Sequence, residues 1–416
     1  MQLNDKIRED IEKTLFEAKT CLFTKNHEEL KRVSDTVIHN SSVFQDEESI
    51  EVAITLYSLA KVLEKKTELT EQFYHLFTHI EQLFKRKQYH AYKKAMAHLL
   101  CKIKEVDQNT QQYAKHVINH AKVNKGSRLF HHGISLGQSA CAMGISQWEL
   151  YDYVGKTHSS TGDTKSVRAE RKRMAYAQLL TKHKNNTVVF DAGPIITSTM
   201  NGILHILPKL KKIMNADFLI PNGVYNEVIE KPMKTKKYKL EAYRVISYIN
   251  DGTFHHIKQK YLKVQTKKYL DLINTAYSAF GNPITIVHEG EMQALALLKM
   301  IGGRTLVIDE RTTRYLMESP KRVVERLSRK LHTKITVDQE KVDKFHKEFE
   351  DITAIRSTEL MTLAYEHGLF NEMIEGMNGL DDSNYQFYEG LLWGLKLAGV
   401  GISEREIAYL QSKLKK

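Results

Sequence analysis

Residues 188–197 read VVFDAGPIIT, and this stretch decides how the middle of the chain must fold. Three strand-forming residues, from Val188 to Phe190, run directly into Asp191. A lone aspartate after a strand is usually a turn residue or the N-cap of a helix. Its meaning therefore depends on whether other acidic residues in the chain are placed to meet it.

Short β-rich segments recur along the middle of the chain, and stretches long enough to form helices separate them. Alternation of this kind predicts a parallel sheet with helices on its faces. The predicted strands are Val188–Phe190, Phe218–Ile220, Phe254–Ile257 and Thr305–Ile308. We therefore predict an α/β domain at residues 186–320.

The two flanks of this segment have a helical pattern. All six prolines lie between residues 194 and 320, and proline breaks helix interiors, so long helices are permitted on both sides. Apolar residues also repeat there with the helical period, as in the face formed by Val52, Leu56, Leu59 and Leu63. We predict all-α regions at residues 1–130 and 321–416, the first best interpreted as a scaffold or protein-binding region.

The overall composition favours an intracellular protein with an anionic partner. The chain has 416 residues, enough for two or three domains, and a formal net charge of +12. The charge favours nucleic acid, although a merely basic surface would give the same total. The three cysteines lack metal-ligand spacing and are expected to be reduced core residues. The N-terminus resembles no signal peptide, and no apolar run is long enough to span a membrane, so we expect a cytoplasmic location.

Four acidic residues follow the predicted strands or open the helices after them. Asp191 and Asp309 come directly after strands, and Glu227 lies early in the helix predicted after FLIPNG. The fourth is Glu291 in VHEGEMQALALL, with Glu289 two positions before it. Residues just past the strand ends of a parallel sheet share one edge, where ligands bind. We therefore expect these carboxylates to share that edge.

Carboxylates gathered at one edge repel each other, and a bound Mg²⁺ or Mn²⁺ ion relieves the repulsion because both ions take oxygen ligands. Such an ion can activate water for attack on a phosphodiester. Each acid also has an ordinary structural interpretation: Asp191 as a cap, Glu227 as a surface helix residue, Glu291 beside a helix dipole and Asp309 in a turn. Their recurrence at successive strand ends favours a shared site.

Four segments together resemble a PIN domain, the nuclease fold of many toxin ribonucleases and RNA-processing enzymes. They are VVFDAGPIIT, FLIPNGVYNEVIEKP, EGEMQALALL and TLVIDERTTRYL, in that family's order within residues 187–316. The resemblance implies a metal-dependent endoribonuclease with Mg²⁺ or Mn²⁺ as cofactor and RNA as substrate, DNA being left open. It also implies that the catalytic and metal-binding residues are Asp191, Glu227, Glu291 and Asp309.

The layout of the whole chain, including GLLWGLKLAGVGISEREI near its end, resembles that of archaeal proteins with a PIN domain and helical flanks. One departure concerns the third acidic motif. Some relatives carry GE-x-E-A where this chain has GEMQA, so Gln293 replaces a carboxylate, and either Glu289 or Glu291 could be the ligand. The departure favours an alternative function, a nucleic-acid-binding regulator or RNA-processing assembly factor with a degenerate site. A homodimer and a protein partner on the helical flanks are both left open.

Residues 131–185 form a predicted connecting unit between the helical and α/β regions. Within it, SLGQSACAMGISQWELYDYVGKT resembles a helix-turn-helix whose second helix, Gln147–Val154, offers Gln147, Glu149 and Asp152 outward. An ordinary αα-hairpin that turns on a glycine is an equal alternative. A basic helix follows.

Lysine and arginine clusters in this unit and in the α/β segment predict contacts with the phosphate backbone. Tyr238, Tyr261 and Tyr269 are interleaved with the lysines and could stack on unpaired bases. The alternative is that these clusters are merely solvated charged faces. The predicted nucleic-acid-binding residues are Lys231, Lys234, Lys236, Lys237, Lys239, Lys260, Lys267, Lys268, Arg171, Lys172 and Arg173.

Overall fold

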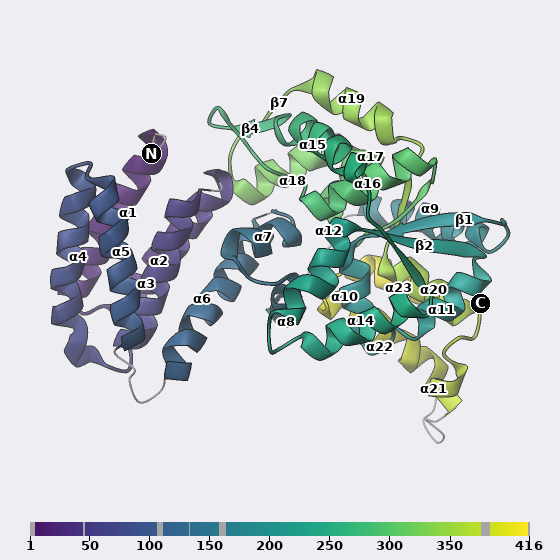
Figure 1. The fold of residues 1–416 in the computed structure, drawn as a ribbon, viewed down its shortest axis with the longest axis horizontal. Coiled ribbons are helices and arrows are strands. Elements are labelled where there is room, and N and C mark those ends of the chain that lie inside the picture. The colour runs from purple at the N-terminus through teal and green to yellow at the C-terminus, as the bar shows by residue number, and fades with distance from the viewer. Residues whose placement is uncertain are drawn as a thin grey trace.

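A lobe of helices is joined to a larger lobe built around a parallel β-sheet (Figure 1). The computed structural model describes residues 5–44, 46–105, 111–132, 134–157, 164–375 and 383–414. Across those ranges, no helix is both long and apolar enough to cross a membrane.

The N-terminal lobe is helical, as the apolar periodicity predicts. The face formed by Val52, Leu56, Leu59 and Leu63 is buried in the core of this lobe. Asp46 starts the third helix by accepting a hydrogen bond from the backbone N–H of Ser49. The helices are α1 (Asp5–Phe23), α2 (His27–Phe44), α3 (Glu47–Leu63), α4 (Thr70–Lys85), α5 (Tyr89–Glu105) and α6 (Gln111–His131).

The sheet of the larger lobe has five parallel strands in the order β3-β2-β1-β6-β8. All four predicted strands are present, and β1 lies at the centre because its valines and Phe190 are buried on both faces. The C-terminal region is helical as expected but also contributes the edge strand β8. The strands are β1 (Asn186–Phe190), β2 (Ala216–Pro221), β3 (Phe254–Ile257), β6 (Thr305–Val307) and β8 (Thr353–Ile355).

Alternate residues of β1 face two separate apolar cores. Val188 and Phe190 pack into one core, and Val189 packs into the other. The first core includes residues of α8 (Gln147–Thr157), α9 (Thr164–Leu180), α10 (Ala192–Met200), α11 (Ile206–Ile213), α14 (Lys239–Asn250), α20 (Ser357–Glu366), α21 (Asn371–Glu375), α22 (Ser383–Leu397) and α23 (Glu404–Leu414). The second includes residues of α15 (Lys260–Asn274), α16 (Glu289–Ile301), α17 (Arg311–Glu318), α18 (Lys321–Leu331) and α19 (Gln339–Phe349).

Smaller elements complete the fold. A three-stranded antiparallel sheet, ordered β5-β4-β7, lies beside the second core. The cysteines depart from the expectation that all are core residues, because Cys21 is buried whereas Cys101 and Cys141 are exposed. The remaining elements are α7 (Leu136–Met143), α12 (Asn222–Tyr225), a π-helical turn (Asn226–Glu230), α13 (Lys231–Met233), β4 (Tyr277–Ala279), β5 (Asn282–Pro283) and β7 (Thr336–Val337).

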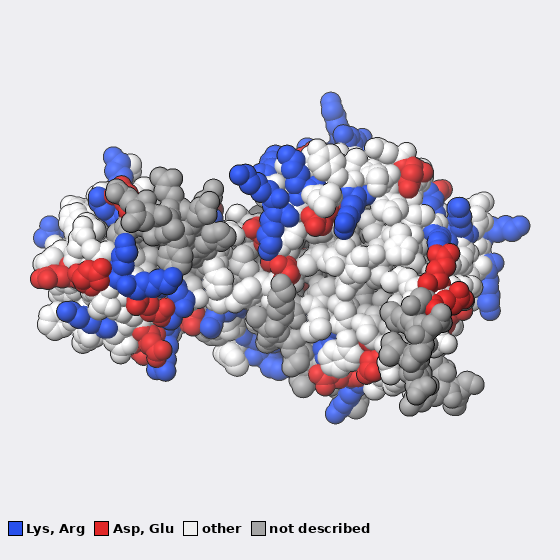
Figure 2. All heavy atoms as spheres, turned by 90° about the horizontal axis from the view of Figure 1, so that it is seen from below, with Lys and Arg blue, Asp and Glu red and all other residues white. Residues whose placement is uncertain are grey.

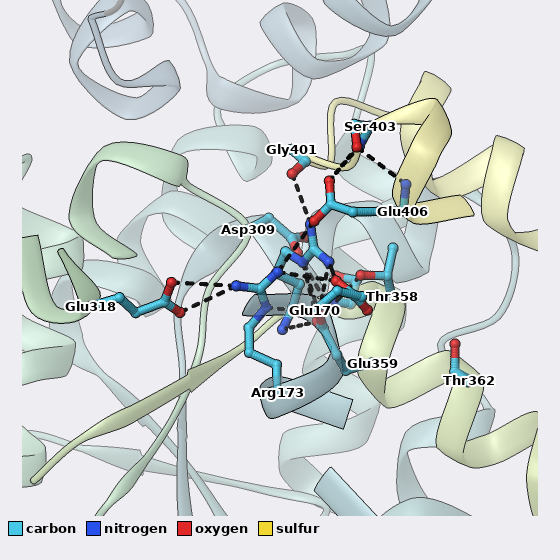
Figure 3. A network of polar contacts seen from close by, with 12 residues as sticks. Glu170, Arg173, Asp309, Glu318, Thr358, Glu359, Thr362, Gly401, Ser403 and Glu406 are labelled. Carbon is cyan, nitrogen blue, oxygen red and sulfur yellow. Dashed lines mark hydrogen bonds and ion pairs between the residues drawn. The ribbon is translucent and has the colours of Figure 1, made fainter. Parts of the chain in front are cut away.

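A buried network of arginines and glutamates ties α9 to the C-terminal helices (Figure 3). Arg173 pairs with Glu318 on one side and with Glu359 and Glu406 on the other. Arg356 pairs with Glu359 and Glu406 as well, and both arginines contact the buried Glu170. The prediction that Arg173 binds nucleic acid is therefore wrong, because its guanidinium is enclosed by four carboxylates inside the protein.

Candidate active site

Asp191 and Asp309 lie side by side at one edge of the sheet, because β1 and β6 are parallel neighbours. Asp191 caps α10 and accepts a hydrogen bond from the Gly193 N–H at 3.5 Å. Gly193 lies against both acids and leaves room for the Tyr151 hydroxyl, which a Cβ at this position would meet at 2.5 Å. Asp191 is therefore the N-cap of α10 and also lies at the same edge of the sheet as Asp309.

Glu227 reaches the same region from the π-helical turn after β2. Turns of this kind are frequent at functional sites. Its carboxylate accepts a hydrogen bond from the Gln147 Nε2 at 2.8 Å and lies 3.0 Å from the His288 Nδ1. Gly290 permits this approach, because a Cβ there would meet the Glu227 Oε1 at 2.9 Å. Glu227 is therefore buried and held by protein partners.

The structure distinguishes between the two glutamates of GEMQA. Glu289 is exposed and accepts a hydrogen bond from Gln293 at 2.9 Å, whereas Glu291 is buried and accepts one from the Thr313 hydroxyl. The Gln293 Oε1 in turn accepts the Gly223 N–H at 2.6 Å. An amide can make both contacts because it donates and accepts, so Gln293 links α12 to α16 and Glu291 is the acid that faces the site.

Burial and mutual repulsion leave these acids with unusual proton affinities. Burial, and then the charge of Glu227, raise the pKa of Asp191 to about 7. Burial raises the pKa of Asp309 to about 6, although hydrogen bonds from Ser357 oppose the rise. Burial, together with the charges of Glu310 and Asp191, raises the pKa of Glu291 well above its usual value. A cluster of buried like charges is typical of a functional site.

His288 supplies a positive charge that was not among the residues predicted for the site. Burial alone would lower the pKa of His288, but hydrogen bonds with Cys141 and Glu227 raise it to about 10. The pKa of Cys141 is lowered in turn by its hydrogen bond with His288. His288 precedes α16 as its N-cap, and its position directly before the EGEMQ motif was the one available signal.

The α7–α8 hairpin, the segment that resembles a helix-turn-helix, packs over the acidic edge. Gln147 is buried against Glu227, so the prediction that Gln147 points outward is wrong. Tyr151 is also buried, and its hydroxyl would lie 2.5 Å from a Cβ at Gly193. Trp148 is fully buried as well. This face of α8 therefore covers the candidate site and is not available to DNA.

The predicted nucleic-acid-binding residues other than Arg173 lie at the surface. Lys231, Lys234, Lys236, Lys237, Lys239, Lys260, Lys267, Lys268, Arg171 and Lys172 are all exposed. Of the interleaved tyrosines, Tyr261 is exposed, whereas Tyr238 and Tyr269 are buried and cannot stack on bases. Seen from below, basic side chains gather along the upper edge of the larger lobe, and the centre of that face is mostly uncharged (Figure 2).

The four carboxylates at the acidic edge are of the chemical type that binds a hard divalent cation, but their present positions do not form a binding site. Four carboxylates supply oxygen ligands, and the pKa values of Asp191, Glu291 and Asp309 are raised by burial and by neighbouring negative charge, which a cation would offset. Within the described ranges, however, no three acidic, histidine or cysteine side chains come close enough together to hold one ion. The reason is local: each carboxylate already accepts hydrogen bonds from protein groups. Metal binding at this edge therefore requires these side chains to leave some of those partners.

Residues 187–321 match a family model described as a PIN domain. The central third of the chain is therefore a PIN domain, a nuclease-type fold, as the four sequence motifs predict. Neither the curated proteins nor the solved structures contain a match to this chain.

Proposed function

We propose that the protein is a metal-dependent endoribonuclease that hydrolyses RNA phosphodiester bonds at the acidic edge of its PIN domain. The observation that carries the proposal is the burial of Asp191, Glu291 and Asp309 together, with pKa values raised by burial and by neighbouring carboxylates. Folding does not gain from such a cluster, because buried like charges destabilise the protein. A bound cation explains why the cluster exists.

Asp191, Glu227, Glu291 and Asp309 would hold Mg²⁺ or Mn²⁺. When bound, such an ion supplies an activated water and neutralises charge on the phosphate oxygens. Ser357 would orient Asp309 and Thr313 would orient Glu291, whereas Glu227 would have to exchange its contact with Gln147 for the metal. The raised pKa values mean that protons compete for Asp191 and Asp309 near neutral pH, so metal binding should strengthen as the pH rises.

The expected substrate is RNA, with DNA left to experiment, and the exposed lysines would attract its backbone. The helical flanks provide surfaces for a protein partner or a second copy of the chain. We assign residues 1–130 to the helical region, 131–185 to the connecting unit, 186–320 to the nuclease domain and 321–416 to the C-terminal region. We expect the protein to act in the cytoplasm.

A second candidate function is a nucleic-acid-binding regulator or RNA-processing assembly factor whose nuclease site is degenerate. The observation that favours it is the hold on Glu227, which pairs with a positively charged His288 and accepts a hydrogen bond from Gln147. If Glu227 keeps its contacts with His288 and Gln147 at all times, the acidic edge cannot bind a metal ion through this carboxylate.

Cleavage of labelled RNA in Mn²⁺ or in EDTA separates the two functions. We expect cleavage in Mn²⁺, none in EDTA, and none by the double variant Asp191→Asn, Asp309→Asn. The matched control is Asp217→Asn, Asp271→Asn, which removes two exposed carboxylates of the same domain and should cleave normally. Equal cleavage by the active-site double variant, or none by the unaltered protein, would reject the nuclease.

A further inference from the structure

A cavity lined mainly by basic side chains lies beside the candidate active site. It has a volume of about 110 Å³ and lies between α17, α18 and the chain at Gly401 and Ser403. A second cavity of about 380 Å³ shares four of its basic residues and extends to Asp309. The shared residues are Arg311, Arg326, Arg329 and Lys330. A path lined by positive charge thus leads from the acidic edge into a small basic cavity.

The amphipathic pattern of α18 creates this lining. Val323, Leu327 and Leu331 recur every four residues and are buried in the core, which turns the basic face of the helix toward the cavity. Gly401 forms part of the opposite wall, where a Cβ would be in ordinary van der Waals contact with the Arg311 Nε at 3.4 Å. The basic residues that α17 and α18 bring to the cavity are Arg311, Arg314, Arg322, Arg326, Arg329 and Lys330.

These six basic side chains outnumber the two carboxylates, Glu325 and Glu406, that line the same cavity. Among the described residues, none of the six forms an ion pair, in contrast to Arg173, which pairs with the buried Glu406 at the far wall. Arg314 is 2% exposed, and its Nε has no hydrogen-bond partner within the described part of the chain. The Nε of Arg326 is buried and unpartnered in the same sense. Burying a cation without a counter-charge is costly.

The arginines also repel one another. Burial, and then the charge of Arg173, lower the pKa of Arg314. Burial, and then Arg311, lower the pKa of Arg326 to about 10. An anion in the cavity would reduce the repulsion among these arginines. A cation at the acidic edge would likewise reduce the repulsion among the carboxylates.

We propose that the basic cavity binds a phosphate group of the nucleic-acid strand whose neighbouring phosphodiester lies at the acidic edge. Arginine forks match phosphate oxygens and bind them with two parallel hydrogen bonds. The cavity is below the range of about 300–1,000 Å³ that whole organic ligands occupy, so it suits one phosphate. The larger cavity, with Phe130 and Tyr151 in its wall, has room for the attached nucleoside.

This inference rests on the proposed function for the identity of the strand, but its test needs no cleavage. Thermal unfolding is measured in EDTA with and without inorganic phosphate. Phosphate should raise the unfolding midpoint of the unaltered protein and of Lys344→Gln, an exposed α19 control. Arg326→Gln should unfold no earlier than the unaltered protein without phosphate, since it removes a repelled cation, and should lose the phosphate effect. A lower midpoint that phosphate still raises would assign Arg326 a structural role and overturn the proposal.

Fluorescence anisotropy in EDTA then identifies the source of the phosphate. Arg329→Gln, at an exposed position where folding is not at risk, should weaken binding of single-stranded RNA about tenfold. A loss confined to 5′-phosphorylated RNA assigns the cavity to a terminal phosphate, and an equal loss for 5′-hydroxyl RNA assigns it to an internal one. Unchanged affinity for both overturns the proposal. Normal binding without cleavage in Mn²⁺ contradicts the nuclease function alone.

Discussion

Ser357 holds Asp309 with two hydrogen bonds, from its backbone N–H to Oδ1 at 2.8 Å and from its hydroxyl to Oδ2 at 2.6 Å. These bonds connect the first residue of α20 to the carboxylate at the end of β6. They favour the ionised form of Asp309 and oppose the effect of burial, which leaves its pKa at about 6. A residue outside the span of the PIN-domain match therefore tunes a candidate metal ligand.

Replacing Ser357 should shift the pH dependence of cleavage. Ser357→Ala removes the hydroxyl donor, so the pKa of Asp309 rises and the acid limb of the Mn²⁺-dependent rate moves to higher pH. Ser357→Thr keeps the donor and should retain the original profile. The measurement is kcat/KM between pH 5 and 9 for all three proteins. An unmoved acid limb in Ser357→Ala would show that Asp309 does not control the rate.

Asp191→Asn should stabilise the metal-free protein at alkaline pH. The folded-state pKa of Asp191 is raised from 3.8 to about 7, so its favourable contribution to folding is present below pH 4 and is lost as the pH rises through 7. The amide carries no charge, so we expect the free energy of unfolding at pH 8 to rise by about 2–4 kcal/mol and to stay unchanged at pH 4. Denaturant unfolding in EDTA measures both values, with Asp217→Asn as control. If the free energy of unfolding at pH 8 does not rise, the ionised Asp191 carboxylate does not destabilise the folded protein.

Gln147→Ala should make the site easier to load with metal. Removing the amide frees one oxygen of Glu227 from the α8 contact, and a few-fold lower Mn²⁺ concentration should then give half-maximal cleavage. Gln138→Ala, a half-buried amide on α7 of the same hairpin, is the control. A higher Mn²⁺ requirement would mean that Gln147 positions Glu227 for the metal and does not compete with it.

Placing a glutamate at position 293, within GEMQA, should not increase RNA cleavage. Gln293→Glu keeps the acceptor for Gly223 but loses the donor to Glu289 and places two carboxylates together. We expect a loss of about 1–3 kcal/mol in the free energy of unfolding and no increase in kcat. Gln293→Met, which removes both hydrogen bonds without adding charge, separates the two effects. A rise in kcat for the glutamate variant would identify a true fifth ligand.

Arg173→Met should destabilise the fold without a specific effect on RNA. It leaves Glu170, Glu359 and Glu406 buried with one arginine, Arg356, and such losses cost about 3–5 kcal/mol. Lys172→Gln, at the exposed neighbouring position, should leave stability unchanged and weaken RNA binding slightly if α9 contacts the backbone. Unfolding and anisotropy measurements on the folded proteins give both quantities.

The parts that sequence predicts best are those that depend on local pattern. The central strands follow from runs of β-branched and aromatic residues, and Asp191 and Asp309 follow from their position at strand ends. Strand β8 has three residues and no pattern of its own, so it is recognisable through its pairing with β6 alone. The position of β8 at the end of the sheet is therefore determined by tertiary contacts.

The errors have one physical origin, which is that charge in a sequence does not say where its partner lies. Arg173 belongs to a basic run, yet three of its partners are 145, 186 and 233 residues away. Gln147 lies in the helix that resembles the second helix of a helix-turn-helix, but its hydrogen-bond partner Glu227 lies 80 residues further along the chain. The same principle applies to Arg326, for which no prediction was made and which the packing of α17 against α18 turns toward a cavity. The roles of these three residues depend on contacts with distant parts of the chain, which a local sequence pattern does not reveal.

Because of the edge strand β8, the sheet domain extends beyond the residues that match the PIN family. A chain cut in the loop before Thr353 would expose the unpaired edge of β6 and invite aggregation. The same cut would separate Asp309 from Ser357 and Glu170 from Arg356. Proteolysis at a single point, more than 40 residues after Asp309, would therefore unfold the domain, and any fragment made to test for RNA cleavage must retain the C-terminal helices.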